Sequence, residues 1–358
     1  MSFHEILIAV MAGFALLGAA DRIFGNRWGL GKEFEEGILA MGSLALAMVG
    51  IVSLAPVLAT VLKPIVVPVY GFLGADPAMF AGTILACDMG GGPLAVQMTR
   101  DPQAAMLGGV LTGSMLGATI VFTIPVAMGI LREEDRPAMA KGILCGIVTI
   151  PIGVLVGGIT AGFPLGMVAR NLIPIVLFAV LIALGLWRAE NAMVRGFAIF
   201  GKAVVVLVTV GLGAAIGEEL TGIAVIPGMA PISEGFATVG TISILLAGAF
   251  PLVFLLTKVL RKPLMAAGRK LGINDAAAAG LIASLANSIA TFGMVKDMNE
   301  RGKVVNIAFA VSAAFVFGDH LGFTAGFALE MIGPMIAGKL AGGISAVAVA
   351  MLLTRKDG

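Results

Sequence analysis

Charged residues are scarce in this chain, and their scarcity excludes a soluble globular protein. They make up 12% of its 358 residues, whereas soluble domains carry roughly 25%. Hydrophobic residues make up 59%, and the mean hydropathy is +1.06. Connecting segments are short and none is of low complexity, so no room remains for a soluble domain. The composition therefore predicts an all-α polytopic membrane protein, organised as a single membrane domain over residues 1–358.

Cysteine and histidine are also rare, which argues against two kinds of site. Cys87 and Cys145 both lie in apolar runs, so the sequence predicts no disulfide framework. With two histidines, no HExxH motif and no paired CxxC motif, we expect no protein-built zinc site and no cofactor. The basic residues are dispersed between apolar runs, so nucleic acid is not a predicted partner.

Long apolar runs predict about nine transmembrane helices. The first run is not a cleaved signal sequence, because its positive residues, Arg22 and Arg27, follow it. Some runs need flanking residues to reach the roughly 20 residues that a spanning helix requires. The nine runs are residues 6–20, 38–62, 106–131, 139–162, 167–187, 194–216, 238–259, 304–317 and 336–353.

Residues 34–131 and 232–329 are weak copies of one another at a nearly constant offset. Residues 132–231 form connecting helices between the two copies, and residues 330–353 form a C-terminal helix. The recurring residues are Glu36-Gly37, Gly42, Ala81-Gly82 and Leu131 in the first copy, and Glu234-Gly235, Gly240, Ala279-Gly280 and Leu329 in the second.

Each copy contains an apolar helix that is interrupted by a polar tip at the same relative place. The interrupted segments are residues 78–98 and 276–294. A duplicated unit with a broken helix in each half indicates the binding site of a membrane transporter. The tips read Cys87-Asp88-Met89-Gly90-Gly91-Gly92 and Ala286-Asn287-Ser288.

Charge sets the predicted topology. If both interrupted segments are re-entrant hairpins, the N-terminus lies outside, and among the basic residues of the loops only Lys63, Arg100 and Arg170 face outward. Lys63 stands alone after the first helix of copy one, whereas five basic residues occupy the equivalent loop at 258–270. Equivalent loops of opposite charge predict copies of opposite orientation. We therefore expect an inverted-repeat transporter fold.

Asp88 is the strongest candidate for binding, because an acid at membrane depth is costly and usually faces a cavity. Gly90 and Gly91 let the backbone turn sharply and approach a ligand, and Met89 lies between them and the acid. The carboxylate would pair with a cationic group. Alternatively, Asp88 caps the second half-helix.

Three further groups are candidates. Asn287 and Ser288 offer neutral donors and acceptors at the second tip, for a substrate or for contacts between helices. Asp319 and His320 interrupt the next helix, and they could relay a proton, bind an ammonium and a hydroxyl together, or form an internal ion pair. Glu330 is a weaker candidate without an evident partner.

Glycine spacing predicts close helix packing. The pairs Gly153/Gly157 and Gly338/Gly342 have the GxxxG spacing that allows backbones of neighbouring helices to approach.

Five sequence blocks resemble the EutH family, the ethanolamine-utilisation inner-membrane proteins of bacteria, which are regarded as ethanolamine transporters. The resemblance runs from Asp21 to about Leu353. It implies uptake of ethanolamine across the bacterial inner membrane to feed a cobalamin-dependent ammonia-lyase pathway. The blocks are residues 34–37, 86–91 (ACDMGG), 146–153 (GIVTIPIG), 309–315 (FAVSAAF) and 318–323 (GDHLGF).

The sequence and the resemblance together favour a secondary transporter of a small amino-alcohol cation. Its expected partners are this substrate and the lipid bilayer, and the sequence leaves a homo-oligomer open. Another small polar solute is the alternative within this class. A membrane-embedded hydrolase is disfavoured because Val316 replaces a glycine of the GxGD signature and no GxSxG motif occurs. An amine sensor is also disfavoured, because it would need a cytoplasmic output domain and the sequence shows none. Since the hydrolase motifs are missing, we expect no enzymatic activity.

Overall fold

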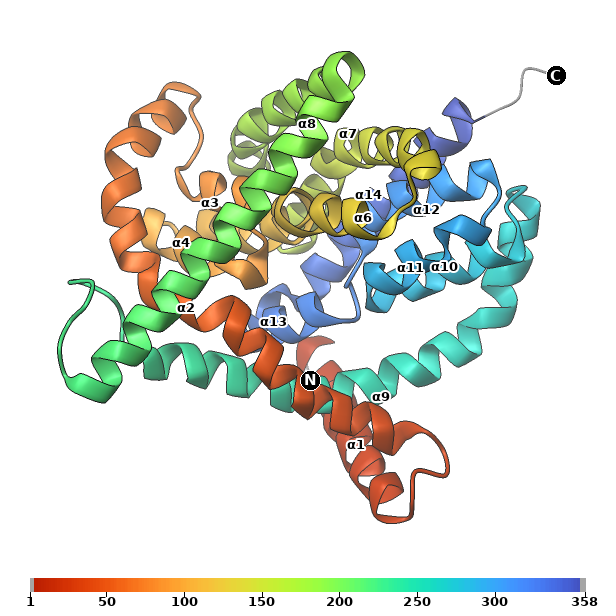
Figure 1. Cartoon of the computed structure of the whole chain (residues 1–358), viewed down its shortest axis with the longest axis horizontal. Helices are drawn as coiled ribbons and strands as arrows, with labels where there is room; N and C mark the ends of the chain where they lie inside the picture. The colour runs from red at the N-terminus through yellow and green to blue at the C-terminus, as the bar shows by residue number, and fades with distance from the viewer. Residues whose placement is uncertain (1–2, 355–358) are drawn as a thin grey trace.

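All regular secondary structure in the part of the chain that the computed structural model describes is helical (Figure 1). It describes the backbone of residues 3–354 and, within that range, all side chains except those of residues 3, 4, 190, 260, 261, 264, 267 and 269. The longer helices are α1 (Phe3–Ile23), α2 (Leu30–Phe72), α7 (Arg136–Thr160), α8 (Leu165–Thr221), α9 (Ile232–Lys270), α12 (Glu300–Ala313) and α14 (Ile332–Leu353). The shorter ones are α3 (Ala78–Ile84), α4 (Gly91–Met98), α5 (Pro102–Met106), α6 (Ile124–Ile130), α10 (Asp275–Ala286), α11 (Ser288–Met294) and α13 (Asp319–Phe327).

Eight helical segments of the described chain are long and apolar enough to cross a membrane, so the protein is a multi-pass membrane protein. The prediction of a ninth span at residues 304–317 is wrong, because α12 has only 14 residues. The chain leaves helical geometry at Ala314 and adopts a left-handed conformation at Phe315, with φ of 63°. The eight segments are Glu5–Ile23, Leu30–Phe72, Pro102–Ile130, Glu133–Thr160, Leu165–Ala189, Asn191–Thr221, Ile232–Val259 and Leu329–Leu353.

The predicted interruptions of both short apolar helices are present. The first falls between α3 and α4, where a 3-10 turn at Cys87–Met89 precedes a left-handed Gly90. The second falls between α10 and α11, where Asn287 is extended. In each case the two short helices contact one another. Their re-entry from one membrane face stays a prediction.

The long helices α2 and α9 cross and pack along each other (Figure 1). The contact is close because glycines face it from both sides. A Cβ atom added to Gly37 of α2 would lie 2.5 Å from the backbone nitrogen of Ala247 in α9. One added to Gly235 of α9 would lie 2.9 Å from a side-chain carbon of Val49 in α2.

The two GxxxG pairs lie in a close helix contact, and they lie against one another. A Cβ atom added to Gly338 of α14 would lie 2.7 Å from the carbonyl oxygen of Gly153 in α7, and one added to Gly153 would lie 2.7 Å from that of Gly338. Because α14 can approach α7 so closely, the residue that follows Gly338 is buried in the helix bundle.

Candidate functional site

The Asp88 tip is shaped by backbone bonds from within its own turn. The N–H groups of Met89 and Gly91 both donate to the carbonyl oxygen of Ala86, at 3.0 and 2.8 Å. Gly90 has φ of 99°, and a Cβ atom there would collide with Ile51 of α2. Only glycine fits at this position, where the turn needs left-handed geometry and has no space for a side chain.

Asp88 does not cap the following helix, so the capping alternative is wrong. The N-cap of α4 is Gly90, and among the described residues no side-chain capping hydrogen bond is formed there. At the second tip the reverse holds, because the Oδ1 atom of Asn287 accepts a hydrogen bond of 2.8 Å from the N–H of Ile289. The Asp88 carboxylate is therefore not used to cap α4.

The non-helical segment after α12 places Asp319 and His320. The N–H groups of Phe315 and Phe317 donate to the carbonyl oxygens of Ser284 and Leu285, at 3.0 and 2.9 Å. Those oxygens lie at the C-terminal end of α10, where a helix leaves carbonyls unpaired. The segment after α12 and the C-terminal end of α10 therefore satisfy each other's backbone hydrogen-bonding groups. As a result, α13 begins beside the tip between α10 and α11.

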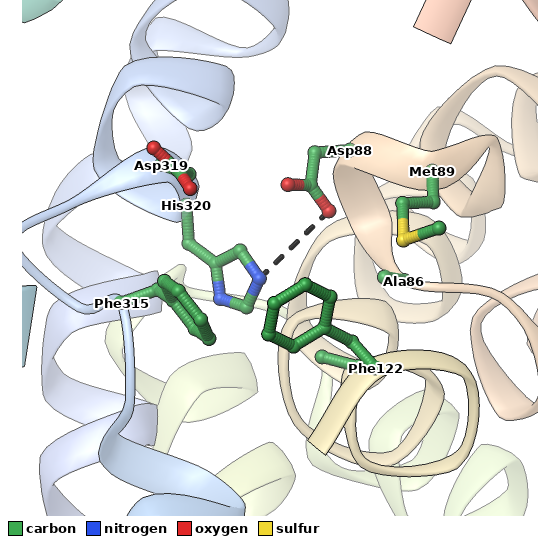
Figure 2. A pocket seen from close by; sticks show the side chains of 8 residues that line it. Ala86, Asp88, Met89, Phe122, Phe315, Asp319 and His320 are labelled. Atoms are coloured by element: carbon green, nitrogen blue, oxygen red, sulfur yellow. Dashed lines mark ion pairs between the residues drawn. The ribbon is translucent and has the colours of Figure 1, made fainter. Parts of the chain in front are cut away.

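A small cavity, called the Asp88 cavity below, brings four predicted site residues together (Figure 2). Its volume is about 30 Å³, roughly the space of one water molecule in the liquid. The rings of Phe122 and Phe315 meet edge to face, with their centroids 5.3 Å apart. The lining residues are Ala86, Asp88, Met89, Ala118, Phe122, Phe315, Asp319 and His320.

The imidazole of His320 lies between the side chains of Asp88 and Lys339. Its Nε2 atom is 3.8 Å from Oδ1 of Asp88, a contact marked by the dashed line in Figure 2. Its Nδ1 atom is 3.0 Å from Nζ of Lys339. Lys339 also donates to the carbonyl oxygen of Ser114. Both His320 and Lys339 are buried. Together Asp88, His320 and Lys339 form a row of polar groups inside the bundle.

Lys339 is a site residue that was not predicted, although the sequence carries a signal for it. A lysine within the apolar run of α14 is an ionisable residue at membrane depth, and such residues are functional candidates by default. Its partner Ser114 lies in a π-helix, Leu107–Gly117. Such helices are rare and often occur at functional sites.

The remaining predicted site residues lie outside the Asp88 cavity. Asn287 lines a second cavity, which it shares with Asp319. Ser288 is fully buried, and its hydroxyl has no partner among the described residues. Gly91 supports the turn, because a Cβ atom there would lie 2.6 Å from the carbonyl oxygen of Leu85. Glu330 is exposed and lines neither cavity.

Cys87, Asp88 and His320 place ligand-type atoms within 4.8 Å of one another. The neighbouring ammonium group of Lys339 opposes a divalent metal ion there, because it already contacts the other nitrogen of the same imidazole. The arrangement suits one organic cation better: carboxylates at Asp88 and Asp319 could bind an ammonium, and the ring faces of Phe122 and Phe315 could contact it.

Comparisons with known proteins point in the same direction. The family model described as "Ethanolamine utilisation protein, EutH" matches residues 3–353. A Listeria monocytogenes protein named "Probable ethanolamine permease EutH" is 60% identical over 356 residues, covering 99% of this chain and 95% of the relative. A Salmonella typhimurium protein of the same name is 48% identical over 395 residues, covering 100% and 97%. The "Uncharacterized protein YxeR" of Bacillus subtilis is 53% identical over 354 residues, covering 99% and 96%. No solved structure matches the chain.

Proposed function

Because this chain belongs to the EutH family, we propose that it is a secondary transporter that imports ethanolamine across the bacterial inner membrane. One observation carries the proposal. Asp88 and Asp319, acids from interruptions far apart in the sequence, line one small cavity inside a bundle of membrane helices. Acids are kept at such depth where they face a substrate or a cavity.

Ethanolamine fits the chemistry of this cavity. Its amine resembles that of lysine and is protonated at neutral pH. The ammonium group would bind between the carboxylates of Asp88 and Asp319, in charge-assisted hydrogen bonds. The rings of Phe122 and Phe315 would add cation–π attraction. His320 would orient the Asp88 carboxylate through its Nε2–H group.

Alternating access would follow from the predicted inverted repeat. The contact between α2 and α9 supports a pseudo-two-fold relation, because Gly37 and Gly235, which occupy equivalent places in the two copies, each face the other helix. The halves would rock around the tips at Asp88 and Asn287. An inside-negative membrane potential would draw the cation inward, by about 2.3 kcal/mol per 100 mV.

The test is uptake of radiolabelled ethanolamine into proteoliposomes, with and without an imposed inside-negative potential. We expect saturable uptake that rises with the potential. Asp88→Asn should lower it by roughly thirtyfold or more, because one partner of a buried charge contact is lost. The matched control is Glu330→Gln, which removes an exposed acid outside the cavity and should leave uptake unchanged. Wild-type uptake that neither saturates nor responds to the potential would contradict the proposal.

Unlabelled competitors decide between ethanolamine and another small polar solute. If ethanolamine is the substrate, it should suppress labelled uptake at lower concentration than other amino-alcohols or small carboxylates. A carboxylate that competes better would overturn the assignment, since Asp88 and Asp319 would repel it.

A further inference from the structure

A second cavity lies on the other side of Asp319 and is much larger than the Asp88 cavity. Its volume is about 320 Å³, against about 30 Å³. The second cavity, called the Glu33 cavity below, is formed by the first turn of α2, the middle of α9 and the tip between α10 and α11. Its lining residues are Glu33, Phe250, Val253, Phe254, Thr257, Ala286, Asn287 and Asp319.

The sizes decide where a substrate fits in this conformation. The Asp88 cavity has space for about one water molecule, whereas ethanolamine has four non-hydrogen atoms. The Glu33 cavity falls within the range of small-molecule sites, roughly 300–1,000 Å³. Asp319 lines both cavities. A cation held in the larger cavity would therefore already touch a carboxylate of the smaller one.

The Glu33 cavity offers unused groups for an ammonium and a hydroxyl. Within the described part of the chain, neither Glu33 nor Asp319 makes a hydrogen bond or an ion pair, and both are half-buried. Among the described residues, the side chain of Asn287 bonds through its Oδ1 atom alone, in capping α11, and its NH₂ group has no partner there. Thr257 donates its hydroxyl proton to the carbonyl oxygen of Phe254 at 2.9 Å and keeps lone pairs as acceptors.

Phe250 and Phe254 give this cavity an aromatic wall. The ring of Phe254 also lies 4.8 Å from Nζ of Lys258, an exposed residue that does not line the cavity. The faces of such rings attract an ammonium group.

We propose that the Glu33 cavity is a second binding site for the primary ammonium substrate. Glu33 and Asp319 bind the ammonium there, Asn287 and Thr257 bind the hydroxyl, and Asp319 passes the cation between the two cavities. The substrate assignment rests on the proposed function. In the predicted topology Glu33 and Thr257 lie toward the cytoplasm, so the site is the one from which imported substrate leaves.

The test uses a cysteine at Thr257, a half-buried position in the cavity wall. Thr257→Cys protein in lipid nanodiscs is labelled with 2-aminoethyl methanethiosulfonate, a primary ammonium, and with the neutral methyl methanethiosulfonate. The parent chain gives the background, since Cys87 and Cys145 are both buried. We expect Glu33→Gln to lower the ratio of the two rates by about fivefold, as removal of one nearby charge should. Glu36→Gln, which removes an exposed acid of the same helix, is the matched control and should leave the ratio unchanged.

Protection by ethanolamine separates the two cavities. Ethanolamine should slow the labelling of the Thr257→Cys single variant and of the double variant with Asp88→Asn. It should not slow the labelling of the double variant with Glu33→Gln. Glu33→Asp, which keeps the charge, should retain protection and guards against a folding defect. An unchanged rate ratio in Glu33→Gln would overturn the proposal, and so would loss of protection in Asp88→Asn. Failure of wild-type uptake would overturn the proposed function instead, and the rate ratio would still report on the Glu33 cavity.

Discussion

The Nζ atom of Lys339 lies 3.0 Å from Nδ1 of His320, and both side chains are buried. We predict that Lys339 is an ammonium, which has donors and no acceptor, so that Nδ1 accepts. A neutral imidazole then carries its proton on Nε2, the nitrogen that faces Asp88 at 3.8 Å. Lys339 thereby acts on the Asp88 cavity without lining it, as a positioning residue.

Lys339→Met should lower uptake without a comparable loss of fold stability. Methionine fills similar space without a charge that must be desolvated, although the carbonyl oxygen of Ser114 and Nδ1 of His320 lose their partner. Because these two effects oppose each other, we expect little change in the thermal unfolding temperature. Uptake should fall roughly tenfold, as when a group that orients a ligand-binding histidine is lost. Proteoliposome uptake and thermal unfolding in detergent measure the two effects.

Nitrogen NMR reports the tautomer directly. The chain has two histidines, so His4→Gln leaves only the signals of His320. In that background the parent should show protonation at Nε2, and Lys339→Met should show a mixture of tautomers. An identical spectrum in both proteins would contradict the positioning role, even if uptake fell.

The helix interruptions could be predicted from sequence because their causes are local. Gly90, two residues after Asp88, adopts the left-handed geometry at which the apolar helix is interrupted, and glycine allows that geometry wherever the helix is placed. The failed ninth span has a less visible cause. The run at 304–317 is apolar, but its helix ends because the N–H groups of Phe315 and Phe317 bond to carbonyls of α10. Only the tertiary arrangement supplies those acceptors.

The partners of the site residues could not be predicted from the sequence either, because they too depend on the tertiary arrangement. Asp88 and His320 are brought together by the interruption after α12, and Lys339 reaches His320 because α14 packs closely on α7. Glu33 reads as an ordinary charge in the first turn of a helix. It faces a cavity only because α9 crosses α2 beside it.

Gly338→Ala should destabilise the fold. The added Cβ atom would lie 2.7 Å from the carbonyl oxygen of Gly153, closer than real contacts allow, so α14 and α7 must separate. Overpacking of this kind costs about 1–3 kcal/mol. The matched control is Gly213→Ala in α8, where nothing lies within 4 Å of the new atom. Thermal unfolding should show a lowered midpoint for Gly338→Ala alone, and equal midpoints would contradict the packing argument.

Lys303 should give the folded state a pH dependence at alkaline pH. It lies outside the eight candidate spans, and its Nζ atom is 2.7 Å from Oδ1 of the buried Asp135. Asp135, and after it Glu300, raises the pKa of Lys303 above the ordinary value of 10.5. Because the pKa is higher in the folded state, the stabilisation is complete below pH 10.5 and is lost as pH rises through the folded value.

Lys303→Met should remove that dependence. It leaves the Asp135 carboxylate buried without its cation, at a cost of about 3–5 kcal/mol near neutral pH. The difference in unfolding midpoint between wild type and variant should therefore shrink above pH 10.5. Glu300 is 83% exposed, so Glu300→Gln should cost less than about 1 kcal/mol. A difference that stays constant with pH would mean that the ion pair does not stabilise the fold.

The inverted repeat predicts that the two hairpins are reached from opposite sides of the membrane. Arg100 follows the second half-helix of the first hairpin, and Lys296 follows that of the second; both are exposed. In whole cells, Arg100→Cys should react with a membrane-impermeant thiol reagent, whereas Lys296→Cys should react only after permeabilisation. Cys87 and Cys145 are buried, so the parent chain should give low background. Labelling of both positions from one side would mean parallel repeats, and the alternating-access proposal would then lose its symmetry argument.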